Sequence, residues 1–286
     1  MNFKTPIAII IYNRPEKTKR LFSVIKKIKP SQLYIIADGP KNEEDKLKCN
    51  LVKEVIASID WKVDLKIIES DYNMGNVPRT ISGLNWVFSQ TEHAIILEDD
   101  CIPDFSFFSY CENLLNYYKY DKDVMHISGY NILQEIPNAE ASYFFSKYIL
   151  PPWGWATWSR AWEKFNVNMD SWQQHKKEIY VNISQENFKT WTDTFEFLRM
   201  HKIGWDIPWN VDIWANSGVG IIPSVNLINN IGFDEEATYT KKGTEFAKIT
   251  SAEIKFPIVH PKIKNFTFDK DIESKCIELL KSIAND

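Results

Sequence analysis

Short apolar runs and longer amphipathic segments alternate through the first hundred residues of the chain. Residues 15–28 carry apolar side chains three and four positions apart, and Pro15 and Pro30 stand at the two ends, which is typical of a helix. The apolar runs are rich in isoleucine and have the length of buried strands; they lie at residues 7–11, 33–37, 65–69 and 94–97. This alternation predicts an α/β fold with a mainly parallel central sheet flanked by helices.

The regular alternation ends near residue 129, after a predicted helix that ends near Tyr118 and a short strand at 124–129. Residues 143–240 mix aromatic strands, turns and helices, including a predicted helix from Glu186 to Met200. No Gly-, Pro- or Ser-rich linker and no internal repeat divides the chain. This favours a single domain that spans residues 1–286. Its expected parts are a nucleotide-binding half, 1–130, an acceptor and catalytic half, 131–245, and a C-terminal extension, 246–286, with an amphipathic helix over 271–284.

Composition narrows the class of protein. With 286 residues, 44% of them apolar, the chain can bury a substantial core, and a net charge of -4 gives no sign of a nucleic-acid partner. The four cysteines are far apart and show no CxxC spacing, which favours reduced thiols over a zinc site or a disulfide framework. No apolar run is long enough to span a bilayer and no signal peptide is apparent. We therefore expect a cytoplasmic protein with at most peripheral contact with the inner face of the membrane.

Three consecutive acids, Glu98, Asp99 and Asp100, follow the fourth apolar run directly. In open α/β sheets the ligand crevice lies at the carboxyl ends of the strands, which is where these acids should lie. Three adjacent carboxylates repel one another unless a cation or hydrogen-bond donors offset them, and a hard ion such as Mg²⁺ or Mn²⁺ suits oxygen ligands best. The simpler alternative is that the acids cap the helix that follows Pro103, although a cap needs only one acid.

Polar residues also follow the other three predicted strands. Asn13 and Arg14 come after the first, Asp38 after the second, and residues 71–76 after the third. Parallel strands bring these positions to one rim, where Arg14 would pair with a phosphate, Asp38 would accept from a base or ribose hydroxyl, and a metal on Asp100 would bridge two phosphates. Because neither GxGxxG nor GxxxxGK[ST] is present, a dinucleotide fold or a P-loop is not expected. The pattern predicts a nucleoside diphosphate site.

Several short motifs, in this order, resemble the glycosyltransferases of the GT-A fold, and more narrowly the N-acetylglucosaminyltransferase I type and bacterial transferases of surface glycans. The likeness covers roughly residues 5–240. The motifs are Ile-Tyr-Asn-Arg-Pro at 11–15, Ala-Asp-Gly at 37–39, Asn-Met-Gly-Asn at 73–76, Leu-Glu-Asp-Asp-Cys-Ile-Pro-Asp-Phe at 97–105, Trp-Gly-Trp-Ala-Thr-Trp-Ser at 153–159, Gly-Trp-Asp at 204–206 and Ile-Pro-Ser-Val-Asn at 222–226.

The resemblance implies roles for these residues. The acid triplet matches the DXD-type motif, in which Asp100 would ligate Mn²⁺ or Mg²⁺ while Glu98 and Asp99 contact the ribose and the donor sugar. Arg14 and Asp38 match the nucleotide-base contacts, which implies uridine. The expected donor-binding set is Asn13, Arg14, Asp38, Gly75, Arg79, Glu98, Asp99, Trp153, Gly154 and Trp155.

An inverting transfer also needs a carboxylate that takes the proton of the acceptor hydroxyl. By resemblance this catalytic base is Asp206, with Asp212 as the second choice, and the alternative for Asp206 is a cap on a helix that starts near Pro208. Trp205 and Trp209 are expected to contact the acceptor, against the equally reasonable alternative that the tryptophans pack in the core. The family's late histidine ligand is missing, with Tyr239 in that stretch, and the polar residues 232–243 are expected to form a lid.

The leading hypothesis is an inverting, metal-dependent glycosyltransferase that moves a sugar from a nucleotide-sugar donor, such as UDP-GlcNAc, to a glycan or lipid-linked glycan in bacterial surface polysaccharide or glycoconjugate synthesis. A sugar nucleotidyltransferase is the first alternative, although it needs a Gly-rich basic loop where the chain has Tyr12-Asn13-Arg14-Pro15. A non-catalytic glycan-binding protein is the second, although such a protein would not need to keep all four acids.

Overall fold

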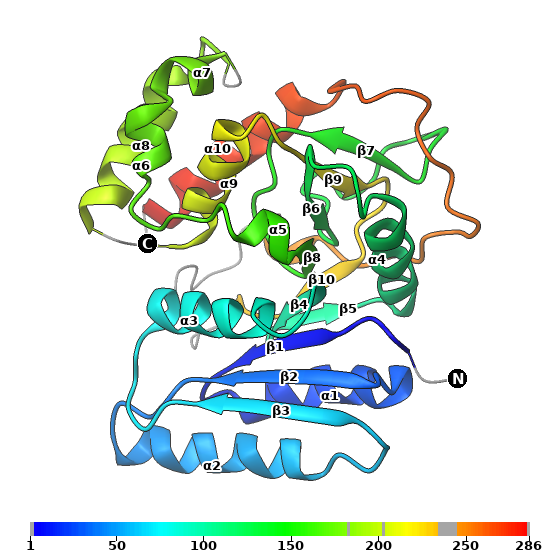
Figure 1. The fold of residues 1–286 in the computed structure, drawn as a ribbon, viewed down its shortest axis with the longest axis vertical. Helices are drawn as coiled ribbons and strands as arrows, with labels where there is room; N and C mark the ends of the chain where they lie inside the picture. Colours follow the sequence, from blue (N-terminus) through cyan, green and yellow to red (C-terminus); the bar gives the residue numbers. More distant parts are fainter. Residues whose placement is uncertain (1–2, 182–183, 202–203, 234–244, 285–286) are drawn as a thin grey trace.

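A central sheet of eight strands runs through the protein in the order β3-β2-β1-β4-β8-β6-β9-β7 (Figure 1). The computed structural model describes residues 3–181, 184–201, 204–233 and 245–284. The first half of the chain, blue to cyan in Figure 1, forms the lower part of the molecule, and the second half forms the upper part. The sheet continues through both parts, so strands from both halves share one hydrophobic core.

The first half has the predicted strand–helix alternation. All three strand pairs in it, β3 with β2, β2 with β1 and β1 with β4, are parallel. The isoleucine-rich runs are the strands. The side chains of β1, β2 and β4 are almost all buried on both faces of a sheet that helices cover, whereas β3, at the edge of the sheet, is partly exposed. The elements are β1 (Ile7–Ile11), α1 (Pro15–Ile28), β2 (Gln32–Ala37), α2 (Glu43–Ala57), β3 (Asp64–Glu69), α3 (Asn76–Phe88) and β4 (His93–Glu98). The predicted α/β fold is confirmed.

The second half departs from simple alternation because β8 enters the sheet antiparallel to both of its neighbours, β4 and β6. The β6–β9 pair is parallel and the edge pair β9–β7 is antiparallel. A separate two-stranded sheet, β5 with β10, lies just after the acid triplet. The strands are β5 (Cys101–Pro103), β6 (Val124–Ser128), β7 (Tyr143–Ser146), β8 (Trp155–Trp158), β9 (Val219–Pro223) and β10 (Ile228–Asn230).

The helices of the second half cover this part of the sheet and extend beyond it (Figure 1). They are α4 (Phe105–Tyr117), α5 (Ser159–Trp162), α6 (Asp170–Gln174), α7 (Lys176–Tyr180), α8 (Phe188–His201), α9 (Asp206–Ala215), the 3₁₀ helix η1 (Glu245–Lys248) and α10 (Asp269–Ala284). Within the described ranges, every helix is too short or too polar to cross a membrane.

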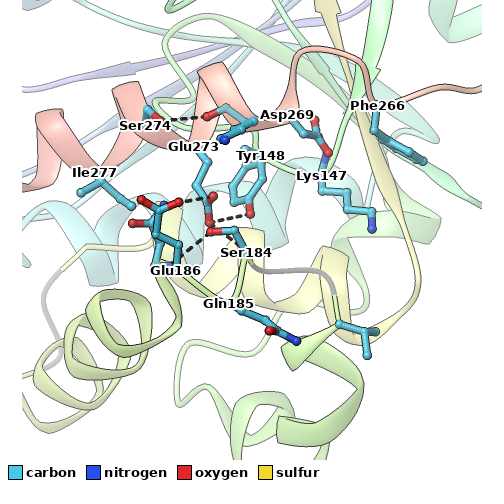
Figure 2. A pocket seen from close by; sticks show the side chains of 13 residues that line it. Lys147, Tyr148, Ser184, Gln185, Glu186, Phe266, Asp269, Glu273, Ser274 and Ile277 are labelled. Carbon is cyan, nitrogen blue, oxygen red and sulfur yellow. Dashed lines mark hydrogen bonds between the residues drawn. The ribbon is translucent and has the colours of Figure 1, made fainter.

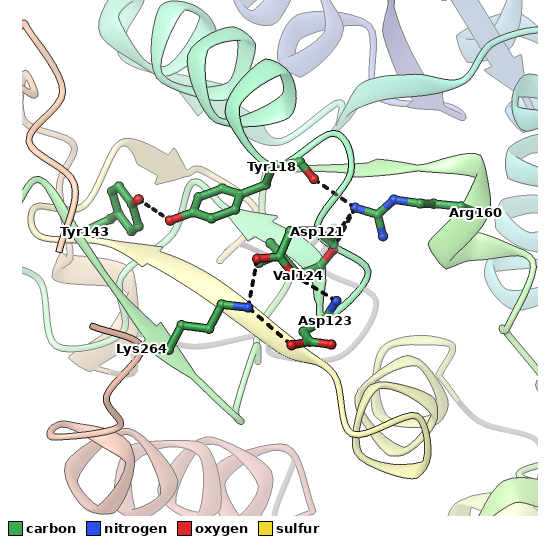
Figure 3. A network of polar contacts seen from close by, with 7 residues as sticks. All are labelled: Tyr118, Asp121, Asp123, Val124, Tyr143, Arg160 and Lys264. Atoms are coloured by element: carbon green, nitrogen blue, oxygen red, sulfur yellow. Dashed lines mark hydrogen bonds and ion pairs between the residues drawn. The ribbon is translucent and has the colours of Figure 1, made fainter. Parts of the chain in front are cut away.

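Two cations fix the turn between α4 and β6 (Figure 3). The Arg160 guanidinium lies over the Trp158 ring, 4.3 Å from its centroid, and donates to the carbonyl oxygens of Tyr118, Asp121 and Val124 over 2.9–3.2 Å. The Tyr118 carbonyl is at the end of α4, where the helix leaves it unpaired, and the other two lie in the turn and at the start of β6. Lys264 reaches the same turn from the C-terminal segment, with its Nζ 2.8 Å from the Asp121 carboxylate, so the C-terminal segment is tied to the main sheet.

Candidate functional site

The ends of β1, β2 and β4 open into a cavity of about 370 Å³. Because these strands are parallel and adjacent, the residues that follow each of them meet at one edge of the sheet. Seven of the ten predicted donor-binding residues line this cavity: Asn13, Arg14, Asp38, Gly75, Arg79, Glu98 and Asp99. The structure thus brings these residues together, and their contacts with a donor stay a prediction.

Arg14 connects the first strand end to the acid triplet. Its Nη1 lies 3.1 Å from Asp99 Oδ1 and 2.8 Å from Asp100 Oδ2. Burial of Arg14 lowers the pKa of its guanidinium, but the nearby carboxylates outweigh this effect and raise the pKa overall, so Arg14 stays charged. In this arrangement Arg14 offsets part of the negative charge of the acid triplet.

Arg14 alone does not compensate the acid triplet. Burial, together with the negative charges of Asp100 and Asp99, raises the pKa of Glu98 to about 8. Burial also raises the pKa of Asp99 to about 7, although Arg14 opposes the change. Glu98 and Asp99 therefore keep protons that isolated carboxyls lose well below neutral pH. The site therefore has the electrostatic character of one that gains from an added cation.

Asp100 is the acid expected to hold a metal. Arg14 donates to its Oδ2, and the Cys101 thiol lies 3.6 Å from its Oδ1. A β-carbon at Gly232 would lie 2.4 Å from Asp100 Oδ2, so only glycine permits this approach of the backbone. No group of three or more His, Cys, Asp or Glu side chains with metal-binding geometry occurs in the described part of the chain. A cation on Asp100 stays a prediction.

Asp38 anchors the loop that follows β3. Its Oδ1 accepts hydrogen bonds from the backbone N–H groups of Gly39 and Met74, both at 2.9 Å. Its Oδ2 accepts from the Asn73 side chain at 2.9 Å and from the Gly75 N–H at 3.0 Å. Four donors occupy the acceptor positions of the carboxylate, so Asp38 shapes the wall of the cavity through this loop. A base contact, as the resemblance implies, would have to share these oxygens.

We expect Asp38→Ala to lower the free energy of unfolding by about 1–2 kcal/mol, because three backbone N–H groups lose their acceptor. Asp71→Ala, in the same loop but with an exposed side chain, is the matched control and should leave the stability unchanged. Chemical denaturation of both variants measures the difference. Equal stabilities of the two variants would contradict the anchoring role of Asp38.

Asp45 holds two residues of the loop after β1, a role that its position in the sequence does not indicate. It lies in the first turn of α2, where its N–H donates to the Asn42 cap at 2.9 Å. Its carboxylate accepts from the Tyr12 hydroxyl and, at 2.7 Å, from the Asn13 side-chain amide. The pairing of Asn42 with Asp45 is visible as a helix cap in the sequence, but its contact with the β1 loop depends on the fold.

Asp206 is the first residue of α9, and burial raises the pKa of its carboxyl. Its charge is also among the causes of the raised pKa of Glu98, after burial and the charges of Asp100 and Asp99. Gly204, with a φ of +73°, precedes it, and a β-carbon there would lie 2.8 Å from Asp206 Oδ1. The helix begins at Asp206 rather than near Pro208. Asp206 therefore lies in the first turn of α9, and this position also fits the alternative that it caps the helix.

Asp212 lies elsewhere. It is six residues further along α9 and is 1% exposed. Its carboxylate accepts from the Asn166 N–H at 2.7 Å and from the Ser171 hydroxyl. Burial raises its pKa to about 7. One oxygen is engaged by the loop between α5 and α6 and the other by α6 itself, which favours a structural role for Asp212. Asp206 stays the first candidate for the base.

The tryptophans expected to contact sugars require a correction. Trp155, Trp205 and Trp209 are no more than 3% exposed, and the Trp155 and Trp205 rings stack with centroids 5.4 Å apart. Trp209 Nε1 donates to Nδ1 of the buried His126 at 3.2 Å. The prediction that these three rings line sugar sites is wrong in this structure, because their faces are covered by one another and by the core.

Two other predicted donor-binding residues, Trp153 and Gly154, directly precede Trp155. Trp153 is half-buried between Tyr130 and Phe233, with ring centroids 4.8 and 5.3 Å away. Gly154 has a φ of +64°, and a β-carbon there would lie 2.5 Å from Ile228 Cδ1. Tight packing against β10 therefore explains Gly154 without a donor, whereas Trp153 keeps its predicted role as a proposal. Tyr239 and residues 234–243 of the predicted lid lie outside the described residues.

A larger cavity, of about 790 Å³, lies between α10 and the segments around Tyr148 and Ser184 (Figure 2). None of the predicted site residues lines it. The Glu273 carboxylate in this cavity accepts from the Tyr148 hydroxyl at 2.8 Å and from Trp191 Nε1 at 2.9 Å. Burial acts to raise the pKa of Glu273, but these donors outweigh it and lower the pKa overall. Glu273 thus joins α10 to α8, which is a structural role.

No family model and no curated protein matches the chain. Among solved structures, 4-diphosphocytidyl-2C-methyl-D-erythritol synthase from Anaerococcus prevotii is 8% identical, with a TM-score of 0.36 over 68% of this chain and 85% of that chain. Apo UDP-glucose pyrophosphorylase is 9% identical, with a TM-score of 0.39 over 86% and 97%. UDP-glucose pyrophosphorylase complexed with UDP-glucose is 10% identical, with a TM-score of 0.27 over 51% and 62%. Similarity at this level leaves the activity of this chain to be inferred from its own residues.

Proposed function

We propose that the protein is a transferase that binds a nucleotide sugar, with the nucleoside diphosphate in the cavity at the ends of β1, β2 and β4. The observation that carries this proposal is the combination, in one cavity, of acids that gain from a cation and of two guanidinium groups, the half-buried Arg14 and the buried Arg79. A diphosphate would supply negative charge to the guanidinium groups, and a divalent ion bound with it would supply positive charge to the acids.

Arg79 supports the placement of an anion. Its side chain is 4% exposed, and its guanidinium donates to the Ile68 carbonyl oxygen at 2.5 Å and lies 3.8 Å from the Met74 sulfur. Among the described residues no ion pair joins Arg79 to a carboxylate, and its Nε is buried without a hydrogen-bond partner. Burial lowers its pKa because the charge lacks water and a close counter-ion. A phosphate at the cavity wall would supply that counter-ion.

The finer proposal is an inverting glycosyltransferase. The acceptor hydroxyl oxygen forms a bond to the anomeric carbon of the donor sugar, the bond from that carbon to the diphosphate oxygen breaks, and Asp206 takes the hydroxyl proton. Asp100 would hold Mn²⁺ or Mg²⁺ together with the diphosphate. When bound, this ion stabilises the negative charge that develops on the leaving diphosphate. Burial of Asp206 favours the proton transfer because it raises the basicity of the carboxylate.

The proposed donor is a UDP-sugar, such as UDP-GlcNAc, and the proposed acceptor is a glycan or lipid-linked glycan of a bacterial surface. A sugar nucleotidyltransferase is the alternative, and the names of the similar solved structures fit it. Against it, the loop after β1 has no glycine, and its one arginine is paired with Asp99 and Asp100 rather than free to hold a triphosphate.

A screen of thermal stability with nucleotide sugars, each with and without Mn²⁺, tests the proposal. We expect one UDP-sugar to raise the melting temperature only when metal is present, and Asp100→Asn to abolish the shift. Asp104→Asn, which alters a helix-capping acid four residues further along the chain, is the control that keeps metal-dependent binding. A protein that no nucleotide sugar stabilises, or one that instead joins UTP to a sugar 1-phosphate with release of pyrophosphate, would exclude the glycosyltransferase.

A further inference from the structure

The segment between η1 and α10 has an unusual composition for this chain. Residues 254–268, which we call the C-terminal strap, contain three lysines and no acidic residue, whereas the whole chain has 38 acids against 34 Lys and Arg. The strap is the orange trace along the right edge of Figure 1. In an acidic protein, such a segment is the part that can approach a negatively charged surface without repulsion.

Large apolar side chains are exposed on the same segment. Ile263 is 67% exposed, and four of the fourteen exposed large hydrophobic residues in the described structure lie between positions 256 and 266. Single exposed apolar residues are ordinary, but four within eleven positions, interleaved with lysines, form a pattern typical of membrane-surface segments. The four are Phe256 at 48%, Val259 at 51%, Ile263 at 67% and Phe266 at 36%.

The exposure of these side chains is imposed by contacts that hold the strap in place. The Ile254 N–H donates to Ser106 Oγ at 3.0 Å. The Val259 N–H and carbonyl both bond to Ser142, each over 2.9 Å. The Lys264 ammonium pairs with Asp121 in the turn shown in Figure 3. Because the backbone is fixed at several points, the strap presents its apolar side chains without an ordering cost on binding.

A cavity of about 410 Å³ lies beneath the strap, against the edge of the sheet. Val259, Ile263 and Phe268 line it from the strap, and Phe144 and Phe145 line it from β7. Two of the four exposed apolar side chains, Val259 and Ile263, are therefore continuous with a recess that is partly apolar. A flat protein partner would not fill this recess, whereas the chains of lipids can.

We propose that the C-terminal strap is a membrane-docking surface for an anionic lipid bilayer. Phe256, Val259, Ile263 and Phe266 enter the interface, and Lys255 and Lys262, whose side chains are exposed, face the lipid phosphates. Lys264 contributes less charge, because Asp121 and Asp123 neutralise it. The strap begins at Ile254, whose N–H bonds to Ser106 in the first turn of α4.

Flotation with vesicles of phosphatidylcholine, with or without 30 mol% phosphatidylglycerol, tests the surface on the full chain, and it needs neither nucleotide sugar nor metal. We expect binding to the anionic vesicles, with a partition coefficient about tenfold lower for Ile263→Ser. Leu47→Ser on α2 is the matched control, since Leu47 is also 67% exposed, and it should bind as the wild type does. Equal losses for the two variants would overturn the proposal.

The charge contribution is tested separately. The double variant Lys255→Ala/Lys262→Ala should bind anionic vesicles roughly thirtyfold more weakly, while Lys46→Ala/Lys53→Ala on α2 should not. If the wild-type protein binds no vesicle but self-associates, and Ile263→Ser disperses the oligomer, the surface is an interface between copies and the membrane proposal fails. Failure here leaves the proposed transferase activity untouched, because nucleotide-sugar binding is measured without lipid.

Discussion

Asp206→Asn is expected to reduce turnover about a thousandfold while the nucleotide-sugar donor still binds. A positioned general base contributes roughly 10²–10⁴ to the rate, and asparagine keeps the shape of the side chain but cannot accept the hydroxyl proton. Donor affinity should change little, because Asp206 comes from α9 and the cavity that holds the proposed diphosphate is lined from β1, β2, β4 and α3. Initial rates and calorimetric titration with the donor from the thermal screen measure the two quantities.

Asp212→Asn is the control for this experiment, because it makes the same chemical change on the same helix. Asp212 is buried against the segment between α5 and α6 and is not among the residues that line the strand-end cavity. Its turnover should stay within about threefold of the wild type. An Asp206→Asn variant that keeps a tenth or more of the wild-type rate, with Asp212→Asn strongly impaired, would move the base role to Asp212.

The strands and their polar ends are predictable from local sequence. The run 7–11 is β1 residue for residue, and Asp38 follows β2 directly. Glu98 is the last residue of β4, and Asp99 and Asp100 follow it. Isoleucine-rich runs of this length have few alternatives to a buried strand, and parallel pairing then places their ends together. For these residues, sequence neighbours alone determine the position at the edge of the sheet.

The roles of the tryptophans and of Asp38 were not predictable in the same way. A tryptophan is equally suited to a sugar site and to a core, and only the antiparallel insertion of β8 decides that Trp155 is covered. Asp38 is separated from Met74 and Gly75 by more than thirty residues, so its hydrogen bonds require the tertiary structure. The contact of Asp45 with Tyr12 and Asn13 has the same origin.

Asp212→Asn should also stabilise the protein at alkaline pH, which is the second large effect that we expect. Burial raises the pKa of Asp212 from 3.8 to about 7 in the folded protein. Because the folded pKa lies above the unfolded one, the contribution of Asp212 to stability is complete below pH 3.8 and is lost as pH rises through about 7. Three pKa units correspond to about 4 kcal/mol, and relaxation around the charge reduces this to about 3 kcal/mol.

Asparagine fits the same site without a charge. Its carbonyl oxygen can accept from the Asn166 N–H, and its amide can donate to Ser171 Oγ, so both contacts of the native side chain persist in altered form. The difference in the free energy of unfolding between Asp212→Asn and the wild type should therefore grow by about 3 kcal/mol from pH 4 to pH 8, in favour of the variant. Urea denaturation at several pH values measures it. Asp71→Asn, which alters an exposed carboxyl, should show no such trend, and a flat difference for Asp212→Asn would mean that water or a cation reaches this carboxylate in the folded protein.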